Sequence, residues 1–191
     1  VLPEHIRQYL RSRGLTDGVI DEYKLGYGQF YRKWWITIPI KDTYGSYAYF
    51  KLRQDPTFGD EKITYPKGAE AQLYDWQMLT NANNQPLIIC EGELDRLALI
   101  SKSVSAITST HGAGTFKEEW IKNIGNYRKI YICFDNDEAG KKGSERVAKM
   151  VENGGFETYI ITLPDEVGSG GDITDYLTKL NNPTDDLFSK Y

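Results

Sequence analysis

Residues 130–140 read IYICFDNDEAG, and this stretch decides the fold. The apolar run KIYICF is typical of a buried strand, and it leads directly into Asp135, Asn136 and Asp137. A helical pattern, EAGKKGSERVAKMVEN, follows at residues 138–153. A buried strand that ends in carboxylates and is followed by a helix indicates one unit of an α/β sheet.

The same unit recurs on both sides of this stretch. The pattern predicts strands at LIIC, SAITS and ETYIIT, and helices at ELDRLALISK, FKEEWIKNI and DITDYLTKL. Because continuously apolar strands alternate with helices, we expect a parallel sheet with helices on both faces. The polar segment NANNQP at residues 81–86 separates this domain, residues 84–191, from a first domain of residues 1–83.

The first domain has a different pattern. A helix is predicted over residues 3–13, and a second helix begins after Thr16 as its N-cap. The runs WWITIPI and SYAYFKLR are rich in aromatic and β-branched residues, and KDTYG between them predicts a turn. Residues 54–70 contain two prolines and two glycines and are expected to form an ordered loop. The first domain is therefore expected to be small and of the α+β class.

Composition excludes several classes of protein. The chain has 191 residues, 40% of them hydrophobic, which argues against disorder. No apolar run approaches the roughly 20 residues that span a bilayer, so we expect a cytoplasmic protein. Two cysteines, Cys90 and Cys133, are too few for a disulfide framework or a four-ligand zinc site. The formal charge of −4 excludes a uniformly basic nucleic-acid binder, although a local basic groove beside an acidic site is compatible with it.

Acidic side chains follow three of the predicted strands. Glu91 follows LIIC, Asp135 and Asp137 follow KIYICF, and Asp172 and Asp175 come after ETYIIT and a glycine-rich loop. Because parallel strands end at the same edge of a sheet, these carboxylates are expected to converge. Converging carboxylates repel one another unless a cation such as Mg²⁺ or Mn²⁺ is bound. This pattern predicts a site for phosphoryl or nucleotidyl transfer.

Each acidic residue also has a structural interpretation. The DND stretch and Asp172 could be helix N-caps, and Glu91 could stabilise a helix start through the helix dipole. Asp95 stands one helical turn after Glu91 and is expected to form a solvated pair with it. His111, in THGAG, is more often a turn residue than a ligand. The residues alone leave these alternatives open.

Three motifs together carry a family resemblance. EGELD at 91–95, FDNDEAGKK at 134–142 and GDITDYL at 171–177 occur in this order, each after a predicted strand. Together they resemble the Toprim domain, the catalytic module of DnaG-type and phage-type primases, topoisomerases and several nucleases. The resemblance implies a Rossmann-like parallel sheet with helices on both faces.

The resemblance also implies roles for the acidic residues. The catalytic residues of the Toprim family correspond to Glu91, Asp135 and Asp137. The same three residues, with Asp172 at a more variable position, would hold Mg²⁺ or Mn²⁺.

The first domain resembles one branch of the family. RGLTDGVIDEYKLGYG is similar to the opening of the RNA polymerase domain of DnaG-type primases, and KLRQDPTFGDEKITYPKGAEAQLYDW is similar to their basic subdomain. The residues that we expect to contact template, primer or nucleotide are Lys51, Arg53, Lys62, Lys67, His111 and Lys141. For Lys51, Arg53 and Lys62 the alternative is ordinary solvation of a strand or loop. The aromatic residues Tyr47, Tyr49 and Phe50 are expected either to stack on bases or, more often, to form the hairpin core.

These observations lead to three hypotheses. The first is the catalytic domain of a DNA primase, a DNA-directed RNA polymerase that makes short RNA primers on single-stranded DNA from ribonucleoside triphosphates. A replicative helicase in cis or in trans is its candidate partner, at a nucleoid, phage or plasmid replication site. The second is a metal-dependent Toprim nuclease. The third is a non-catalytic nucleic-acid-binding module of a phage or plasmid replication protein.

Overall fold

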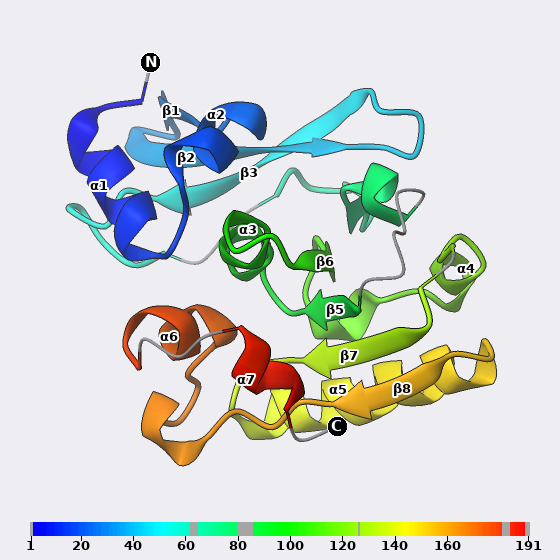
Figure 1. The fold of residues 1–191 in the computed structure, drawn as a ribbon. Coiled ribbons are helices and arrows are strands. Elements are labelled where there is room, and N and C mark those ends of the chain that lie inside the picture. Colours follow the sequence, from blue (N-terminus) through cyan, green and yellow to red (C-terminus); the bar gives the residue numbers. More distant parts are fainter. Residues whose placement is uncertain (1, 62–64, 80–85, 126, 181–183, 190–191) are drawn as a thin grey trace.

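The chain folds into two β-sheets with helices between and around them (Figure 1). The structure is a computed structural model that describes residues 2–61, 65–79, 86–125, 127–180 and 184–189. The boundary predicted between residues 83 and 84 lies outside the described residues, so the division into two domains stays a prediction.

The first part of the chain contains both predicted helices and the predicted hairpin, together with one strand that the pattern did not reveal. Its elements are α1 (Glu4–Ser12), α2 (Asp17–Glu22), β1 (Gly26–Phe30), β2 (Lys33–Lys41) and β3 (Tyr47–Gln54). Thr16 is the N-cap of α2, and its hydroxyl accepts a hydrogen bond from the N–H of Val19 at 3.4 Å. The unexpected strand, β1, pairs antiparallel with β2. Its sequence GYGQF has two glycines, which are poor strand formers, and this explains why no strand is predicted there.

The second sheet is larger and mixed. Its elements and connections are β4 (Leu73–Tyr74), η1 (Trp76–Leu79), β5 (Leu87–Cys90), α3 (Glu93–Ser101), β6 (Ser105–Ser109), η2 (Ala113–Thr115), α4 (Glu118–Ile121), β7 (Lys129–Cys133), α5 (Glu138–Asn153), β8 (Glu157–Ile160), η3 (Asp165–Val167), α6 (Ile173–Thr178) and α7 (Asp185–Phe188). The strand order is β4-β6-β5-β7-β8. The four predicted strands are parallel, but β4 pairs antiparallel with β6 at the edge. The prediction missed β4 because a two-residue strand has no detectable period.

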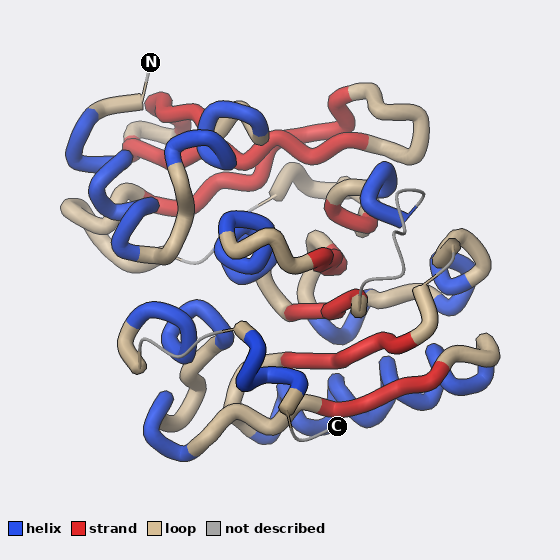
Figure 2. The backbone as a smooth tube through the Cα atoms, viewed as in Figure 1, coloured by secondary structure: helices blue, strands red, loops and turns tan. Residues whose placement is uncertain are grey.

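Helices cover both faces of this sheet, as predicted. Alternate residues of a strand point to opposite faces. Ile88 and Cys90 of β5 belong to a core that includes α3 and α6, whereas Leu87 and Ile89 belong to a second core with α4 and α5. Figure 2 shows α3 between the two sheets and α5 along the opposite face of the larger one.

The first of these cores joins the two parts of the chain. Ile6 and Leu10 of α1 and Ile38 of β2 are fully buried in the same cluster as Leu97 of α3 and Ile88 of β5. The apolar face of the smaller sheet is therefore covered by the helices of the larger one. In the described part of the chain, no helix is both long enough and apolar enough to span a membrane.

Candidate active site

The carboxyl ends of two adjacent strands bring the first two acidic motifs together. Strand β5 ends just before Glu91, strand β7 ends just before Phe134 and Asp135, and the two strands pair in parallel with Cys90 opposite Cys133. The Oε2 atom of Glu91 accepts a hydrogen bond from the backbone N–H of Asp135 at 3.3 Å. The convergence that the parallel topology predicts is therefore present for these two residues.

The DND stretch forms a tight turn into α5. Asp137 is the N-cap of α5, and its Oδ1 accepts a hydrogen bond from the N–H of Gly140 at 2.7 Å. The N–H of Asn136 donates to the carbonyl oxygen of Gly171 at 2.9 Å, which ties this turn to the third motif. Asp137 is thus an N-cap. The cap hydrogen bond uses its Oδ1 atom and does not involve its Oδ2 atom.

Gly140 allows the turn to close. A Cβ atom at this position would lie 2.1 Å from the carbonyl oxygen of Asp135, which is far inside van der Waals contact. We therefore expect Gly140→Ala to displace the turn and to lower the free energy of unfolding by about 1–3 kcal/mol, as overpacking does. Urea unfolding measures the change. Gly18→Ala in α2 is the control, because its Cβ would meet nothing within 4 Å and should raise stability by about 0.5–1 kcal/mol. Equal stability of the Gly140→Ala protein and the wild type would show that the turn does not require glycine at this position.

The third acidic position is held by a helix cap and an arginine. Asp172 is the N-cap of α6, where its Oδ1 accepts a hydrogen bond from the N–H of Asp175 at 2.7 Å. Its Oδ2 accepts a second one from Nη2 of Arg13, at 2.6 Å. Arg13 follows α1, and no local sequence signal indicated that it would reach this edge of the sheet.

Asp95 is buried, and its predicted solvated pairing is wrong. Its side chain is about one-tenth exposed, and its Oδ1 accepts a hydrogen bond from the hydroxyl of Thr174 at 2.6 Å. Nη2 of Arg13 lies 3.7 Å from the same oxygen. The prediction failed because it considered α3 alone, whereas α6 and Arg13 cover this face of the helix.

Burial and mutual repulsion hold protons on this cluster. Burial, followed by the charges of neighbouring carboxylates, raises the pKa of Asp135 to about 8. The neighbours are Glu91, Asp95, Asp172 and Asp137. Burial and Asp172 likewise raise the pKa of Asp95. Near neutral pH and without a cation, Asp135 therefore tends to keep its proton.

The donor set suits a hard divalent cation. All the side chains in the cluster offer oxygen, which Mg²⁺ and Mn²⁺ prefer. Among the described residues, no three His, Cys, Asp or Glu side chains are grouped closely enough to hold a metal by themselves. Mg²⁺ usually takes only one or two protein carboxylates and completes its shell with water and phosphate oxygens. Glu91 and Asp135, with Asp137 beside them, fit that pattern.

Two of the predicted phosphate contacts lie on the inner face of β3. The Lys51 side chain is only 7% exposed, and its ammonium lies 2.7 Å from Oε1 of Glu93 and also donates to the carbonyl oxygen of Thr110. Glu93, in the first turn of α3, is also buried. Arg53 lies on the same face of β3, partly buried. Lys51 is therefore occupied by an internal ion pair, and the predicted phosphate contacts of both residues stay predictions.

The remaining predicted contacts lie around two hollows. The His111 ring stacks on Tyr65 at a centroid distance of 3.7 Å, and burial lowers its pKa. Lys67 lines a groove of about 840 Å³, and Lys141 lines a pocket of about 330 Å³ beside Asp135. Lys62 lies outside the described residues. The binding roles of all four stay predictions.

The aromatic residues of the hairpin divide between the two expected places. Tyr47 and Phe50 are 50% and 48% exposed and line the groove beside Lys67, so they are not part of the hairpin core. Tyr49 is partly buried and packs against the core.

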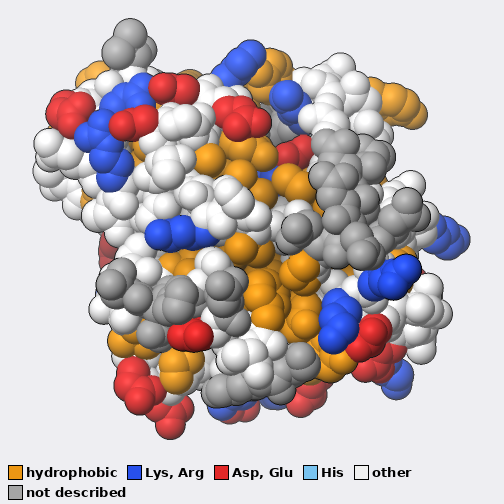
Figure 3. All heavy atoms as spheres, in the orientation of Figure 1, with side chains coloured by type: hydrophobic (Ala, Val, Ile, Leu, Met, Phe, Trp, Pro, Cys, Tyr) orange, Lys and Arg blue, Asp and Glu red, His pale blue; other side chains and the backbone are white. Residues whose placement is uncertain are grey.

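The basic side chains of α1 are engaged with acidic neighbours. Nη2 of Arg7 donates to Asp21, and Arg11 forms ion pairs with Glu4 and Asp17 at 2.9 Å each. Figure 3 shows these charges interleaved over α1 and α2, at the upper left. The surface over α1 and α2 therefore offers little net positive charge to a nucleic acid.

Comparison with known proteins identifies the domain that contains the carboxylate edge. Residues 88–177, which include all three acidic motifs, match the Toprim-like family. Residues 88–177 form a Toprim-like domain. The Toprim-like domain extends from β5 to α6 and contains Glu91, Asp135, Asp137 and Asp172, which confirms the family resemblance of the sequence.

Similarity to other proteins extends beyond the Toprim-like domain. The DNA primase of Chlamydia pneumoniae is 25% identical over 207 residues, covering 85% of this chain and 34% of that protein. The chain spans about a third of the length of the curated primases that it matches. Among solved structures, the Aquifex aeolicus primase with its zinc-binding and RNA polymerase domains has a TM-score of 0.73 at 19% identity, covering 96% of this chain and 55% of that one. A DNA primase domain from Pseudomonas aeruginosa has a TM-score of 0.68 at 23% identity, covering 96% and 69%. The part that precedes the Toprim-like domain thus shares the fold of primase cores as well.

Proposed function

We propose that this chain is the catalytic core of a DNA primase and makes short RNA primers on single-stranded DNA during DNA replication. The observation that carries the proposal is the proximity of Glu91 and Asp135 at the carboxyl ends of adjacent strands, where the carboxylate of Glu91 accepts a hydrogen bond from the backbone N–H of Asp135. This site lies in a chain that has the fold of primase cores along most of its length. Curated relatives named DNA primase support the same reaction.

In the proposed reaction, the 3′-hydroxyl of one nucleotide attacks the α-phosphate of the next, its proton would pass to Glu91, and the bond from the α-phosphate to pyrophosphate breaks. Glu91, Asp135 and Asp137 would hold Mg²⁺ or Mn²⁺, which supplies positive charge for the attacking and leaving oxygens. With such a cation bound, Asp135 would be ionised, because the positive charge would offset the charge of the four neighbouring carboxylates. Arg13 keeps Asp172 and Asp95 in place from the side of α1.

Nucleotide and template are assigned to the two hollows. The exposed ammonium of Lys141 stands beside Asp135 in the smaller pocket, where it would attract the triphosphate. Template and primer would lie in the larger hollow, which Lys67 lines, with a replicative helicase as the partner of the whole protein. These substrates and partners are part of the proposal.

One reaction series tests the proposal. The full-length protein is incubated with single-stranded DNA, labelled ribonucleoside triphosphates and either Mg²⁺ or Mn²⁺, and synthesis and strand cleavage are scored together. We expect short, metal-dependent RNA products, and we expect Glu91→Gln to make them at least about 100-fold more slowly. Glu152→Gln, an exposed position at the far end of α5, is the control with the same chemical change. Cleavage without synthesis would reject the primase hypothesis in favour of the nuclease hypothesis. Binding of single-stranded DNA with neither activity would favour the hypothesis of a non-catalytic binding module.

A further inference from the structure

A small pocket lies at the hairpin turn, away from the carboxylate edge. Its volume is about 130 Å³, and its walls come from the segment after α2, from the ends of β2 and β3 that flank the turn, and from β4 and η1. In Figure 1 the arrowheads of β5, β7 and β8 point to the left, whereas the turn that joins β2 and β3 lies on the right. The pocket is therefore separate from Glu91 and Asp135.

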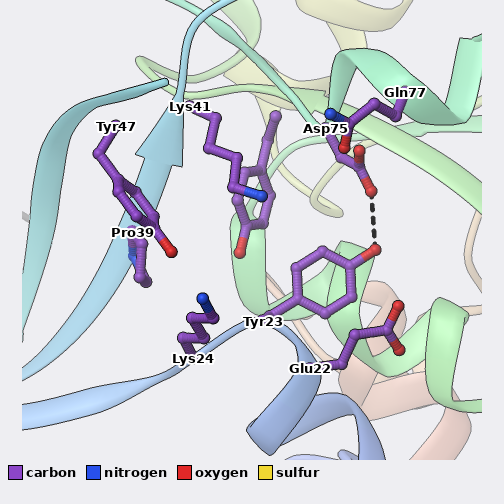
Figure 4. Close-up of a pocket in the computed structure, with 9 residues that line it drawn as sticks. Glu22, Tyr23, Lys24, Pro39, Lys41, Tyr47, Asp75 and Gln77 are labelled. Atoms are coloured by element: carbon purple, nitrogen blue, oxygen red, sulfur yellow. Dashed lines mark hydrogen bonds between the residues drawn. The ribbon is translucent and has the colours of Figure 1, made fainter. Parts of the chain in front are cut away.

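Two ammonium groups meet at this pocket. Nζ of Lys24 lies 5.9 Å from the ring centroid of Tyr47, and Nζ of Lys41 lies 5.7 Å from it. Figure 4 shows the two lysines reaching the pocket from different elements, Lys24 from the end of α2 and Lys41 from β2. Within the described ranges, neither ammonium forms an ion pair.

The acidic residues of the pocket do not cancel this charge. Asp75 accepts a hydrogen bond from the hydroxyl of Tyr23 at 2.7 Å and forms an ion pair with Nη2 of Arg96 at 2.8 Å, as Figure 4 shows for Tyr23. Arg96 is fully buried, so its charge is committed to Asp75. Glu22, Lys24 and Lys41 are all exposed at the pocket. With Asp75 neutralised by Arg96, two ammonium groups stand against the one carboxylate of Glu22, so the lining has a net positive charge.

A buried hydroxyl group lacks an acceptor. Tyr74 lines the pocket and is 4% exposed, and among the described residues its hydroxyl has no hydrogen-bond partner. Burial raises the pKa of this hydroxyl, so it remains protonated and keeps a hydrogen-bond donor that has no acceptor among the described residues. An anion in the pocket would supply that acceptor.

Lys24 occupies a backbone conformation that usually belongs to glycine. It follows the end of α2 with φ of 52°, and the N–H of Leu25 donates back to the carbonyl oxygen of Ile20 at 3.1 Å, which closes the helix. Helices that end in this way generally have glycine at the left-handed position, because a Cβ atom is strained there. Asp75, on the opposite wall, is also left-handed, with φ of 66°. Lys24 and Asp75, on opposite walls of the pocket, therefore both have a strained left-handed backbone conformation.

We propose that this pocket binds an oxyanion of the phosphate class, with Lys24, Lys41 and the hydroxyl of Tyr74 as its donors. A volume of about 130 Å³ admits a phosphate or a diphosphate, whereas the base and sugar of a nucleotide would have to project into solvent. Binding needs no divalent metal, because the donors are two ammonium groups and a hydroxyl. Because the walls belong to the hairpin on one side and to β4 and η1 on the other, the bound anion ties the smaller sheet to the larger one.

The test measures anion binding without metal, template or nucleotide, so its outcome is independent of primer synthesis. The full-length protein is titrated calorimetrically with inorganic phosphate and with pyrophosphate in the presence of EDTA. We expect saturable binding at one site, weakened about tenfold by each of Lys24→Gly, Lys41→Gln and Tyr74→Phe. Tighter binding of pyrophosphate identifies a diphosphate site, and equal binding identifies a site for one phosphate group.

Two features of these variants keep the test decisive. Lys24→Gly relieves backbone strain and Tyr74→Phe removes an unsatisfied hydroxyl, so without the anion both proteins should melt at or above the wild-type temperature. Lys149→Gln, an exposed lysine on α5, makes the same change in net charge far from the pocket and should bind like the wild type. Asp135→Asn should also bind like the wild type. The proposal is overturned if the wild type shows no saturable binding, if Lys24→Gly and Tyr74→Phe bind like the wild type, or if Asp135→Asn abolishes binding.

Discussion

Asp135→Asn is expected to abolish activity and, without metal, to stabilise the protein at pH 8. Under the proposed function, primer synthesis should fall about 1,000-fold, because the amide cannot supply the negative charge that would hold a divalent cation at the ends of β5 and β7. The stabilising effect comes from the same side chain. Burial and four neighbouring carboxylates oppose the ionised form of Asp135, and asparagine has no ionised form.

The pH dependence follows from the direction of the pKa shift. The pKa of Asp135 is about 8 in the folded protein and about 4 in an unfolded chain. Between these values the folded state holds a proton that the unfolded state has released, so the stability of the metal-free wild type falls as pH rises through this window. Thermal unfolding at pH 5 and at pH 8 in EDTA should therefore show Asp135→Asn gaining stability over the wild type as pH rises. Saturating Mg²⁺ should reduce this advantage, because the cation favours the carboxylate.

Asp165→Asn is the matched control for this experiment. Asp165 is exposed in η3, so the same chemical change should alter neither synthesis nor the pH dependence. Primer synthesis at a near wild-type rate by the Asp135→Asn protein would show that Asp135 has no role in catalysis. An advantage in stability that is the same at both pH values would show that the carboxylate is not held in its protonated form.

Breaking the buried pair of Lys51 and Glu93 should have the largest effect on stability. Either Lys51→Met or Glu93→Leu leaves one buried charge without its partner, and we expect each to lower the free energy of unfolding by about 3–5 kcal/mol. Burial raises the pKa of Glu93 even though Lys51 lowers it, which shows how costly this site is for an isolated carboxylate. The double variant should lose much less than the sum of the two, because neither charge is then left behind.

Denaturant unfolding of the four proteins gives this double-mutant cycle. Lys33 and Glu61 form the control pair, because they are about half exposed and Lys33→Met should cost less than about 1 kcal/mol. The cycle also tests the phosphate contact predicted for Lys51. Unchanged stability of Lys51→Met together with weaker DNA binding would show that the ammonium serves a nucleic acid rather than Glu93.

The fold was predictable where hydrophobic periods are long. The four parallel strands and the sixteen-residue α5 follow directly from their apolar patterns. Helix α4 is shorter than FKEEWIKNI suggests and covers only Glu118–Ile121. Strands β1 and β4 escaped prediction because one is rich in glycine and the other has only two residues.

The site was predictable only as far as the topology of the sheet determines it. Parallel strands necessarily end at one edge, so the proximity of Glu91 and Asp135 could be expected. The contacts of Arg13 with Asp172 and of Lys51 with Glu93 could not, because they join residues 159 and 42 positions apart. Such contacts depend on how the first part of the chain packs on the Toprim-like domain. The hydrophobic pattern within a single helix or strand gives no information on that packing.

The shared hydrophobic core has a consequence for how the protein unfolds. Helices α1 and α2 have nine and six residues, too few to persist alone in water. Their buried side chains belong to the same cluster as α3 and β5, so separating the two parts would expose apolar surface on both. The chain should therefore melt in one cooperative transition. A protease acting on the native protein should degrade both parts together rather than release a stable Toprim-like fragment.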